Sequence, residues 1–217
     1  MGLPEVVRVL ESYRGREKTL RTLQYGLLFI TPAARHSYRA TLEAISSQIG
    51  GARVILRLLD DLSMLQYSLG VLRQGKGEDR VVRCLDLASI VVDQLFFPME
   101  HLAWARDVKL LRGSSSPLWH ASLLLWAASL VFTILRSLRK ISLMQQYASE
   151  LTAEEKEKRE EQRDAELLTI IMHAADLLNA LNWLPNRPWS KAFPQWQVGV
   201  FGLTSSLIGF YKLLTAK

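Results

Sequence analysis

The sequence predicts an all-α integral membrane protein with N-terminal amphipathic helices and two transmembrane helices. Two observations support this fold class. No run of residues alternates between apolar and polar side chains with the period of a strand. Two long windows in the C-terminal half, 113–135 and 192–211, carry no formal charge. A helix over either window would be about 30 Å long, which matches the hydrocarbon core of a bilayer.

A buried helix of a soluble protein is the alternative for both windows, because mean hydropathy is only +0.07 and 22% of the residues are charged. The aromatic residues favour membrane spans. Trp119 lies near one end of the first window, whereas Trp189, Trp196, Phe210 and Tyr211 bracket the second. Such side chains gather where a membrane meets water. We therefore expect 117–135 and 198–214 to span, with both chain ends on one face.

Composition excludes several other classes. The net charge of +6 is dispersed along 217 residues rather than gathered in a basic stripe, so no nucleic-acid partner is predicted. Cys84 is the only cysteine, which excludes an intramolecular disulfide and a thiolate zinc cluster and fits a chain that faces the cytosol. The four histidines stand in different segments without ligand spacing. The sequence therefore predicts no metal and no cofactor.

The expected order of the helices follows from the glycine and proline residues that interrupt helical segments. We expect a short helix over 4–13, a break at Gly15, and a helix over 17–30 with Leu20, Leu23, Leu27 and Ile30 on one face. Pro32 should begin the next helix, and Pro98 should end the helix that starts at 80. Four regions result: an amphipathic remodelling region (1–112), the first span with its basic collar (113–140), a charged and amphipathic connection (141–191), and the second span with its tail (192–217).

Residues 33–59 have the pattern of a helix that lies in a membrane interface. Apolar residues follow helical spacing on both sides of Gly50-Gly51, where we expect a break or swivel, and arginines border them. The predicted membrane-inserting residues are Leu42, Ile45, Ile49, Ile55, Leu56 and Leu59. The predicted lipid-headgroup residues are Arg35, Arg39, Arg53 and Arg57. A helix packed in an ordinary bundle would show the same spacing.

A second stripe lies in the second window, where Gly199, Gly202, Ser206 and Gly209 share one helix face at spacings of 3, 4 and 3. Small residues on such a face let a neighbouring helix approach closely. A chance scatter of small residues is the alternative.

The connection between the spans divides into two parts. The charge-rich segment 150–166 predicts a solvated helix, with Glu154/Lys158 and Glu155/Arg159 as i,i+4 pairs. Residues 167–185 are apolar but contain Asp176, and one carboxylate at a bilayer centre costs roughly 2.5–3.5 kcal/mol. We expect this segment to be amphipathic rather than spanning.

Two other functional classes stay open. A pore for small solutes would need polar residues facing a lumen, and the candidates are His120, Ser122, Ser129, Thr204 and Ser205. A lipid enzyme embedded in the membrane would require a convergent acid or histidine site, which only Asp60, Asp61, Glu100 and His101 could supply by folding together. Neither class has a sequence motif in its favour, so we expect no enzyme.

Several segments closely resemble one family in order along most of the chain. They are ESYRGREKTLR at 11–21, ARVILRLLDDLSML at 52–65, VVDQLFFPMEHLAWARD at 91–107, ADLLNALNWLP at 175–185 and FPQWQVGVFGLTSSL at 193–207. They resemble the peroxisomal membrane protein 11 family, and most closely its gamma type. The resemblance implies a multi-pass protein of the peroxisomal membrane that promotes membrane protrusion, elongation and fission without enzymatic activity. It also implies self-association, association with other family members, fission adaptors and a dynamin-type GTPase as partners, and cytosolic termini.

In that family an N-terminal amphipathic helix inserts into one leaflet, and by position it should lie within 33–59 here. This sequence departs from the strongly basic form of that helix, because Glu43 and Ser46-Ser47 dilute its charge and Asp60-Asp61 follow it. The basic residues that flank the first span number three on each side, so the positive-inside rule does not fix its orientation.

Overall fold

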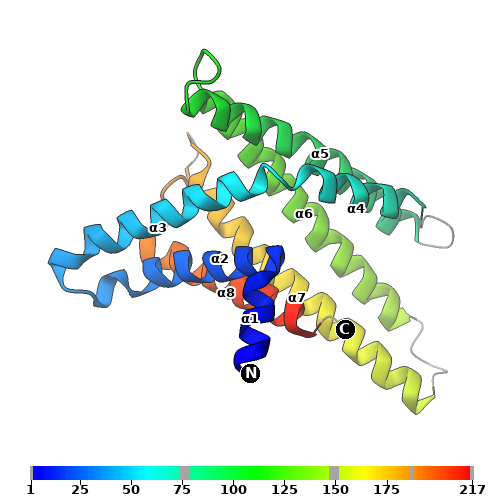
Figure 1. Cartoon of the computed structure of the whole chain (residues 1–217). Coiled ribbons are helices and arrows are strands. Elements are labelled where there is room, and N and C mark those ends of the chain that lie inside the picture. The colour runs from blue at the N-terminus through cyan, green and yellow to red at the C-terminus, as the bar shows by residue number, and fades with distance from the viewer. Residues whose placement is uncertain (1, 74–78, 147–151, 186–187, 216–217) are drawn as a thin grey trace. The chain divides into compact units, whose positions relative to one another are not determined.

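The computed structural model describes residues 2–73, 79–146, 152–185 and 188–215, and these residues form helices without a strand (Figure 1). The described helices are α1 (Leu3–Glu11), α2 (Tyr13–Ile30), α3 (His36–Arg57), α4 (Asp61–Arg73), α5 (Arg80–Asp107), α6 (Ser116–Gln146), α7 (Ala153–Trp183) and α8 (Gln195–Thr215), with a 3₁₀ turn η1 (Thr31–Ala33). The predicted all-α class is confirmed.

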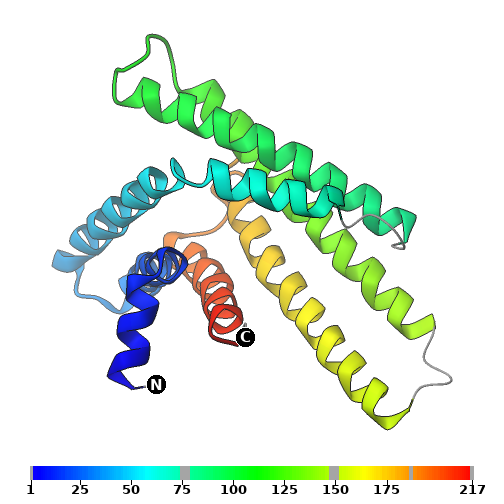
Figure 2. The same cartoon turned by 45° about the vertical axis from the view of Figure 1, so that its right-hand side comes forward.

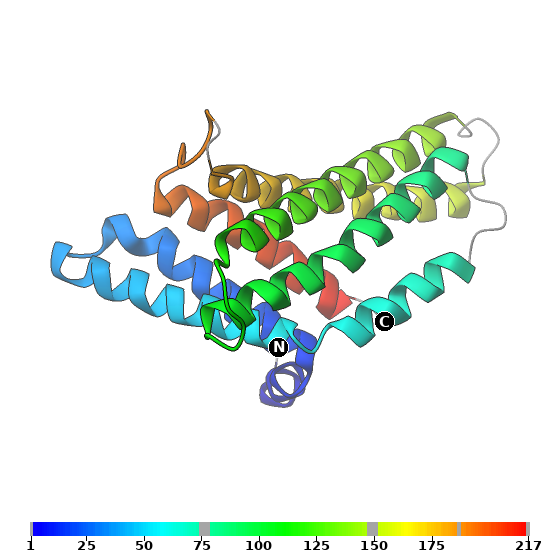
Figure 3. The same cartoon turned by 90° about the horizontal axis from the view of Figure 1, so that it is seen from above.

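The helices form two compact units. The first contains Met1–Leu59 and Leu181–Lys217, so it brings the two ends of the chain together, and in it α2 packs against both α3 and α8 (Figure 2). The second contains Asp60–Ala180, where α5 runs along α6 and α4 packs on α5 (Figure 3). A small apolar cluster joins α6 to α7 and includes Leu130 and Ala180.

The first helix break lies at Ser12 rather than at Gly15. The Ser12 hydroxyl accepts a hydrogen bond from the Gly15 amide at 3.0 Å, so Ser12 caps α2. Gly15 lies inside α2, where a Cβ atom would meet the Val9 carbonyl oxygen at 1.9 Å. Glycine is required there because the end of α1 folds against it, and not because it ends a helix.

The predicted break at Gly50-Gly51 is wrong, because α3 runs through both residues to Arg57. The physical reason is the tertiary contact between α3 and α2. Ser46 and Arg53 hydrogen-bond to α2 on either side of the glycine pair. Each glycine costs a helix only about 1 kcal/mol relative to alanine. The chain breaks after Leu58 instead, and the apolar residues beyond it belong to α4.

The predicted end of a helix at Pro98 is also wrong, since α5 continues to Asp107. Pro98 is exposed, so its ring points away from the neighbouring helices. Contacts to α6 hold α5 on both sides of it, from Asp86 to Arg136 at 3.1 Å and from Asp107 to the Trp119 indole at 2.7 Å. These contacts offset the one backbone hydrogen bond that proline removes.

The charged segment 150–166 and the apolar segment after it form a single helix, α7. The helix begins with a capping box, in which the Glu155 amide donates to the Thr152 hydroxyl at 3.3 Å and the Glu155 carboxylate accepts from the Thr152 amide at 2.9 Å. The predicted pair of Glu154 and Lys158 is present at 2.6 Å. The predicted pair of Glu155 and Arg159 interacts electrostatically, since the Arg159 cation is one of the groups that lower the pKa of Glu155, and the Arg159 guanidinium also donates to the Met144 carbonyl at 2.9 Å.

Two described helices, α6 and α8, are long and apolar enough to cross a membrane. Only 17% of the most apolar window of α6 and 28% of that of α8 is buried within the protein. A core helix of a soluble protein would be mostly buried. Length, composition and low burial together fit an all-α membrane protein.

Candidate functional site: helix contacts and the exposed apolar face

The small-residue face of α8 lies against α2 in the first unit. A Cβ atom at Gly199 would meet the Phe29 amide nitrogen at 2.5 Å, and one at Gly202 would meet the ring of Tyr25 at 2.2 Å. Both glycines are buried, with Val198, Tyr25 and Leu28 around them. The two helix backbones therefore approach so closely that only glycine fits at these two positions.

Hydroxyl and guanidinium groups continue this contact toward the C-terminal end of α8. The Ser206 and Thr22 hydroxyl oxygens are 2.6 Å apart, and the Arg21 guanidinium donates to the Ser205 hydroxyl at 2.9 Å. The same guanidinium lies 5.7 Å from the centre of the Tyr25 ring. The fourth residue of the predicted face, Gly209, lies more loosely, with the flexible Lys18 side chain at 3.4 Å from its Cβ position.

Replacing Gly202 by leucine should therefore separate α8 from α2, since the new side chain would enter the space of the Tyr25 ring. Overpacking of this kind typically costs about 1–3 kcal/mol. We expect a lower thermal midpoint of the purified protein in detergent and faster proteolysis at the α2–α3 connection. Gly209→Ala is the matched control and should leave both unchanged. An unchanged midpoint for Gly202→Leu would contradict the observed packing.

A buried ion pair joins α3 to α2. The Arg53 guanidinium donates to the Glu17 carboxylate at 2.9 Å and to the Gln24 side-chain oxygen at 2.7 Å. Burial lowers the pKa of Arg53 below its ordinary value. Burial alone would raise the pKa of Glu17, but the adjacent Lys18 and Arg53 cations hold it below its ordinary value of 4.5. In this fold Arg53 faces α2, so it reaches a lipid headgroup only if α3 leaves α2.

We expect Arg53→Met to destabilise the first unit strongly, because the partly buried Glu17 carboxylate loses the two hydrogen bonds and the charge of Arg53 and keeps Lys18 beside it. Loss of one partner of such a pair costs about 3–5 kcal/mol. The double variant with Glu17→Gln should recover most of the loss, and Arg35→Ala, at an exposed position, should have little effect. Since the pKa of Glu17 is lowered in the folded protein, the stabilisation is present above the ordinary pKa of 4.5 and is lost as the pH falls below that value and through the lowered pKa. Thermal unfolding across pH 3–7 measures this, and equal midpoints for the single and double variants would contradict it.

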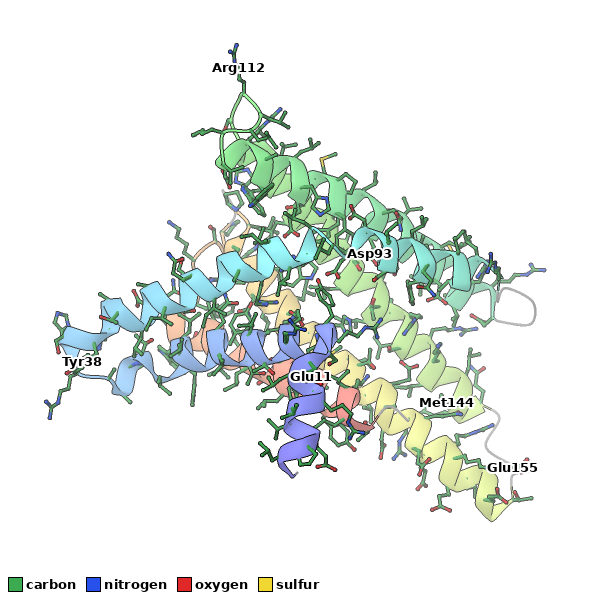
Figure 4. The ribbon with its side chains drawn as sticks, in the orientation of Figure 1. Glu11, Tyr38, Asp93, Arg112, Met144 and Glu155 are labelled. Atoms are coloured by element: carbon green, nitrogen blue, oxygen red, sulfur yellow. The ribbon has the colours of Figure 1, made fainter. Side chains whose placement is uncertain are left out.

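The remaining predicted lipid-facing residues of this segment differ in exposure. Ile45 and Ile55 are half-exposed at 45% and 54%, and Leu59 is 72% exposed beyond the end of α3. The other three, Leu42, Ile49 and Leu56, are of intermediate exposure. Tyr38, at 60% exposure, extends the apolar face toward the start of α3 (Figure 4).

Among the predicted headgroup arginines, Arg35 and Arg39 are exposed at the start of α3, and Arg57 is half-buried at its end. The Arg39 guanidinium donates to the Ala34 and Pro32 carbonyls at 3.3 and 3.1 Å, which ties it to the turn before α3. Arg35 and Arg39 can reach an anionic surface without any change of the fold.

The second unit contains a feature that the sequence analysis missed. Acidic residues recur at intervals of seven along α5, and several of them contact α6. Asp86 pairs with Arg136 at 3.1 Å, Asp93 hydrogen-bonds to Ser129, and Asp107 accepts from the Trp119 indole. The repeat comprises Asp79, Asp86, Asp93, Glu100 and Asp107. The strict spacing was the available signal, since two turns of a helix return a side chain to the same face.

The first member of this repeat is also the cap of α5. The Asp79 carboxylate accepts from the Val81 and Val82 amides and pairs with Arg139 at 2.8 Å. The hydrogen bond from Arg139 is the main reason why the pKa of Asp79 falls to about 2. One carboxylate therefore fixes both the start of α5 and its position beside α6.

Most of the residues considered above for an enzyme site or a pore make contacts within the protein. Asp61 and His101 approach to 3.3 Å, whereas no group of three potential metal ligands occurs in the part of the chain that the structure describes. Of the candidate pore residues, Ser122 donates to the Trp119 carbonyl, Thr204 to the Val200 carbonyl, and Ser205 accepts from Arg21. His120 lies 3.5 Å from the Ser116 hydroxyl, one turn earlier on α6.

Comparisons with known proteins agree with the assignment of this chain as a membrane protein. The family model described as Peroxisomal biogenesis factor 11 (PEX11) matches residues 3–214. The chain is similar to human Peroxisomal membrane protein 11C, with 36% identity over 99% of this chain and 95% of the relative. It is also 37% identical to the mouse protein of the same name over the same shares. No solved structure matches the chain.

These matches define the class of this protein, which is a peroxisomal membrane protein involved in peroxisome biogenesis. The chain belongs to the PEX11 family.

Proposed function

We propose that this protein promotes protrusion, elongation and fission of the peroxisomal membrane, and that α3 acts as a wedge in the cytosolic leaflet. The observation that carries this proposal is the exposed apolar face of α3. Tyr38 and Ile45, which lie about 20° apart around α3, leave large apolar surface uncovered on a helix whose opposite face is polar and whose start carries Arg35 and Arg39.

The wedge follows from the geometry of one helix in one leaflet. An amphipathic helix sinks roughly 5–10 Å below the headgroups and displaces lipid on that side alone. The cytosolic leaflet must then expand relative to the other, and the membrane bends toward the cytosol. Each deeply buried leucine or isoleucine contributes about 1.5–3 kcal/mol, whereas each surface arginine contributes about 1 kcal/mol. The apolar face should therefore matter more than the charges.

Family membership motivates the partners. We propose self-association, association with other PEX11 proteins, and recruitment of fission adaptors and a dynamin-type GTPase. Because α2 occupies the small-residue face of α8 within one chain, we place self-association on surfaces other than Gly199 and Gly202.

A solute pore is less well supported by the contacts. Ser122 and Ser205 are buried and hydrogen-bonded to groups of the protein itself, rather than lined up along one open face.

We expect the double change Ile45→Glu with Ile49→Glu to abolish peroxisome elongation on overexpression, because two carboxylates on the apolar face prevent burial in acyl chains. Ala40→Glu with Ser47→Glu is the matched control. It adds the same charge to exposed positions of α3 on the side opposite Ile45 and Ile49. Fluorescence microscopy of peroxisome length in cells lacking the endogenous protein measures the outcome.

The control should elongate peroxisomes nearly as well as the unmodified protein. Elongation that survives the change at Ile45 and Ile49, at equal protein levels on peroxisomes, would contradict the wedge.

We also propose that both termini face the cytosol. External protease added to intact peroxisomes should then remove tags from both ends, while a matrix marker stays protected. Protection of one tag and loss of the other would show that the chain crosses the membrane an odd number of times, which would contradict this part of the proposal.

A further inference from the structure

We infer that residues 108–112, in the turn between α5 and α6, anchor the protein in the lipid interface at the point where α6 enters the bilayer. The apolar side chains that enter the boundary of the acyl chains are those of Val108, Leu110 and Leu111. The cations that face lipid phosphates are Lys109 and Arg112. The inference goes beyond the proposed function, because it concerns another segment than α3 and holds for either face of the membrane.

The turn begins with a Schellman motif that closes α5. Lys109 has a left-handed backbone conformation, with φ at 64°. Its amide donates to the Arg106 carbonyl at 3.1 Å, and the Leu110 amide donates to the Ala105 carbonyl at 2.9 Å. In such a motif the residue in the position of Leu110 commonly packs its apolar side chain back on the last turn of the helix. Here Leu110 is 73% exposed, so the turn holds this side chain away from the protein.

Leu110 belongs to a short apolar patch that is bordered by cations. Val108 and Leu111 are 52% and 41% exposed, so large apolar side chains at three of four consecutive positions are uncovered. Lys109 and Arg112 are exposed as well, and residues 108–112 contain no carboxylate. A single exposed leucine is ordinary on a protein surface. Apolar side chains gathered beside lysine and arginine are instead typical of segments that lie where lipid meets water.

Polar contacts hold the turn beside the start of α6. The Asp107 carboxylate accepts hydrogen bonds from the Trp119 indole, at 2.7 Å, and from the Ser115 hydroxyl. These two hydrogen bonds hold the pKa of Asp107 below its ordinary value. The Arg106 guanidinium donates to the Ser114 carbonyl at 2.7 Å. The last turn of α5 therefore lies level with the first turn of α6.

The two leucines stay close to this level, and the guanidinium lies farther out. The amides of Leu110 and Leu111 both donate to the Ala105 carbonyl, at 2.9 and 3.1 Å, so the chain curls back on the end of α5. Arg112 follows at the outer end of the turn (Figure 4). From α6 outward the order is the Trp119 indole, the leucines and the guanidinium. This order matches the rise in polarity from the acyl chains to the phosphates.

Continuity with α6 identifies lipid as the occupant of this patch. The α6 helix is long and apolar enough to cross a membrane, and its charge-free window begins at residue 113, directly after Arg112. The bilayer is therefore the apolar phase that the patch meets when α6 inserts. A soluble partner would have to reach the same leucines within the headgroup layer. An anchor at this point sets the depth at which α6 enters the membrane and ties the last turn of α5 to the surface.

The anchor is tested with the fluorophore NBD on single cysteines of full-length Cys84→Ala protein, reconstituted into vesicles of phosphatidylcholine and phosphatidylserine. Iodide on both sides of the vesicles measures exposure to water, and lipids with a nitroxide near the headgroup measure contact with the interface. Leu110→Cys is the test position, and Glu157→Cys, exposed on the charged part of α7, is the control for water. We expect nitroxide lipids to quench the label at position 110, and iodide to quench it several-fold less than the label at position 157.

Equal quenching by iodide at positions 110 and 157 would overturn the anchor. Shielding of position 110 from iodide without quenching by nitroxide lipids would show that protein covers the leucines, and this result would overturn the lipid partner. Both outcomes are independent of α3, so they do not bear on the wedge.

A second measurement separates the role of the leucines from the mere closeness of the turn to the membrane. With the label on Val108→Cys, the double change Leu110→Glu with Leu111→Glu should lift the turn into water, so that iodide quenches position 108 as strongly as position 157. Leu110→Met with Leu111→Met is the matched control, since it keeps apolar side chains and should leave position 108 shielded. Extraction with alkaline carbonate checks that α6 stays inserted in each variant. A label at position 108 that remains shielded in the inserted glutamate variant would show that the leucines do not hold the turn in lipid, and would overturn the inference.

Discussion

The structure depends on one constraint: a polar side chain that faces another helix must find its partner inside the protein. In the first unit the constraint is met where Arg53 reaches Glu17 and Gln24 across α2 and α3. In the second unit it is met along α5, where Asp86 reaches Arg136 and Asp79 reaches Arg139. Because each charged group must lie beside its partner of opposite charge, these contacts set the register of the helices more strictly than apolar packing would.

The same constraint separates two kinds of surface. On α3 the side that faces α2 is polar and paired, one flank is apolar, and the other flank carries Glu43 and Ser47. Such a helix suits a boundary between lipid and water. In the second unit the exposed side of α5 is apolar from Val91 to Leu102, which suits hydrocarbon. The proposed function uses the first kind of surface, because a helix at the boundary between lipid and water disturbs a single leaflet.

The sequence predicted what depends on local pattern. Helical periodicity and the two charge-free windows were sufficient for the all-α class and for the two apolar helices, and the pair of Glu154 and Lys158 on α7 followed from short-range spacing. Glycine and proline were misread at Gly15, Gly50-Gly51 and Pro98. Their effect was decided by contacts with helices distant in sequence, which local propensity does not contain.

The candidate site shows the same division. The small-residue spacing on α8 indicated a contact, but only the fold shows that α2 fills it with Tyr25 and Thr22. Arg35 and Arg53 both border an apolar stripe in the sequence. In the fold, Arg53 is buried against Glu17, whereas Arg35 is exposed. The acidic repeat of α5 is visible in the sequence as a seven-residue spacing of carboxylates, a pattern that metal-ligand and catalytic motifs do not contain.

The depth of α3 in a membrane tests the central claim most directly. A spin label at position 45, and separately at position 47, in full-length Cys84→Ala protein reconstituted into anionic vesicles would report collisions with oxygen, which partitions into lipid, and with a water-soluble nickel complex. The account predicts that the label at position 45 collides mainly with oxygen at roughly 5–10 Å below the phosphates, while the label at position 47, on the opposite side of α3, collides mainly with nickel. Equal nickel collision rates at both positions would place α3 in water and contradict the account.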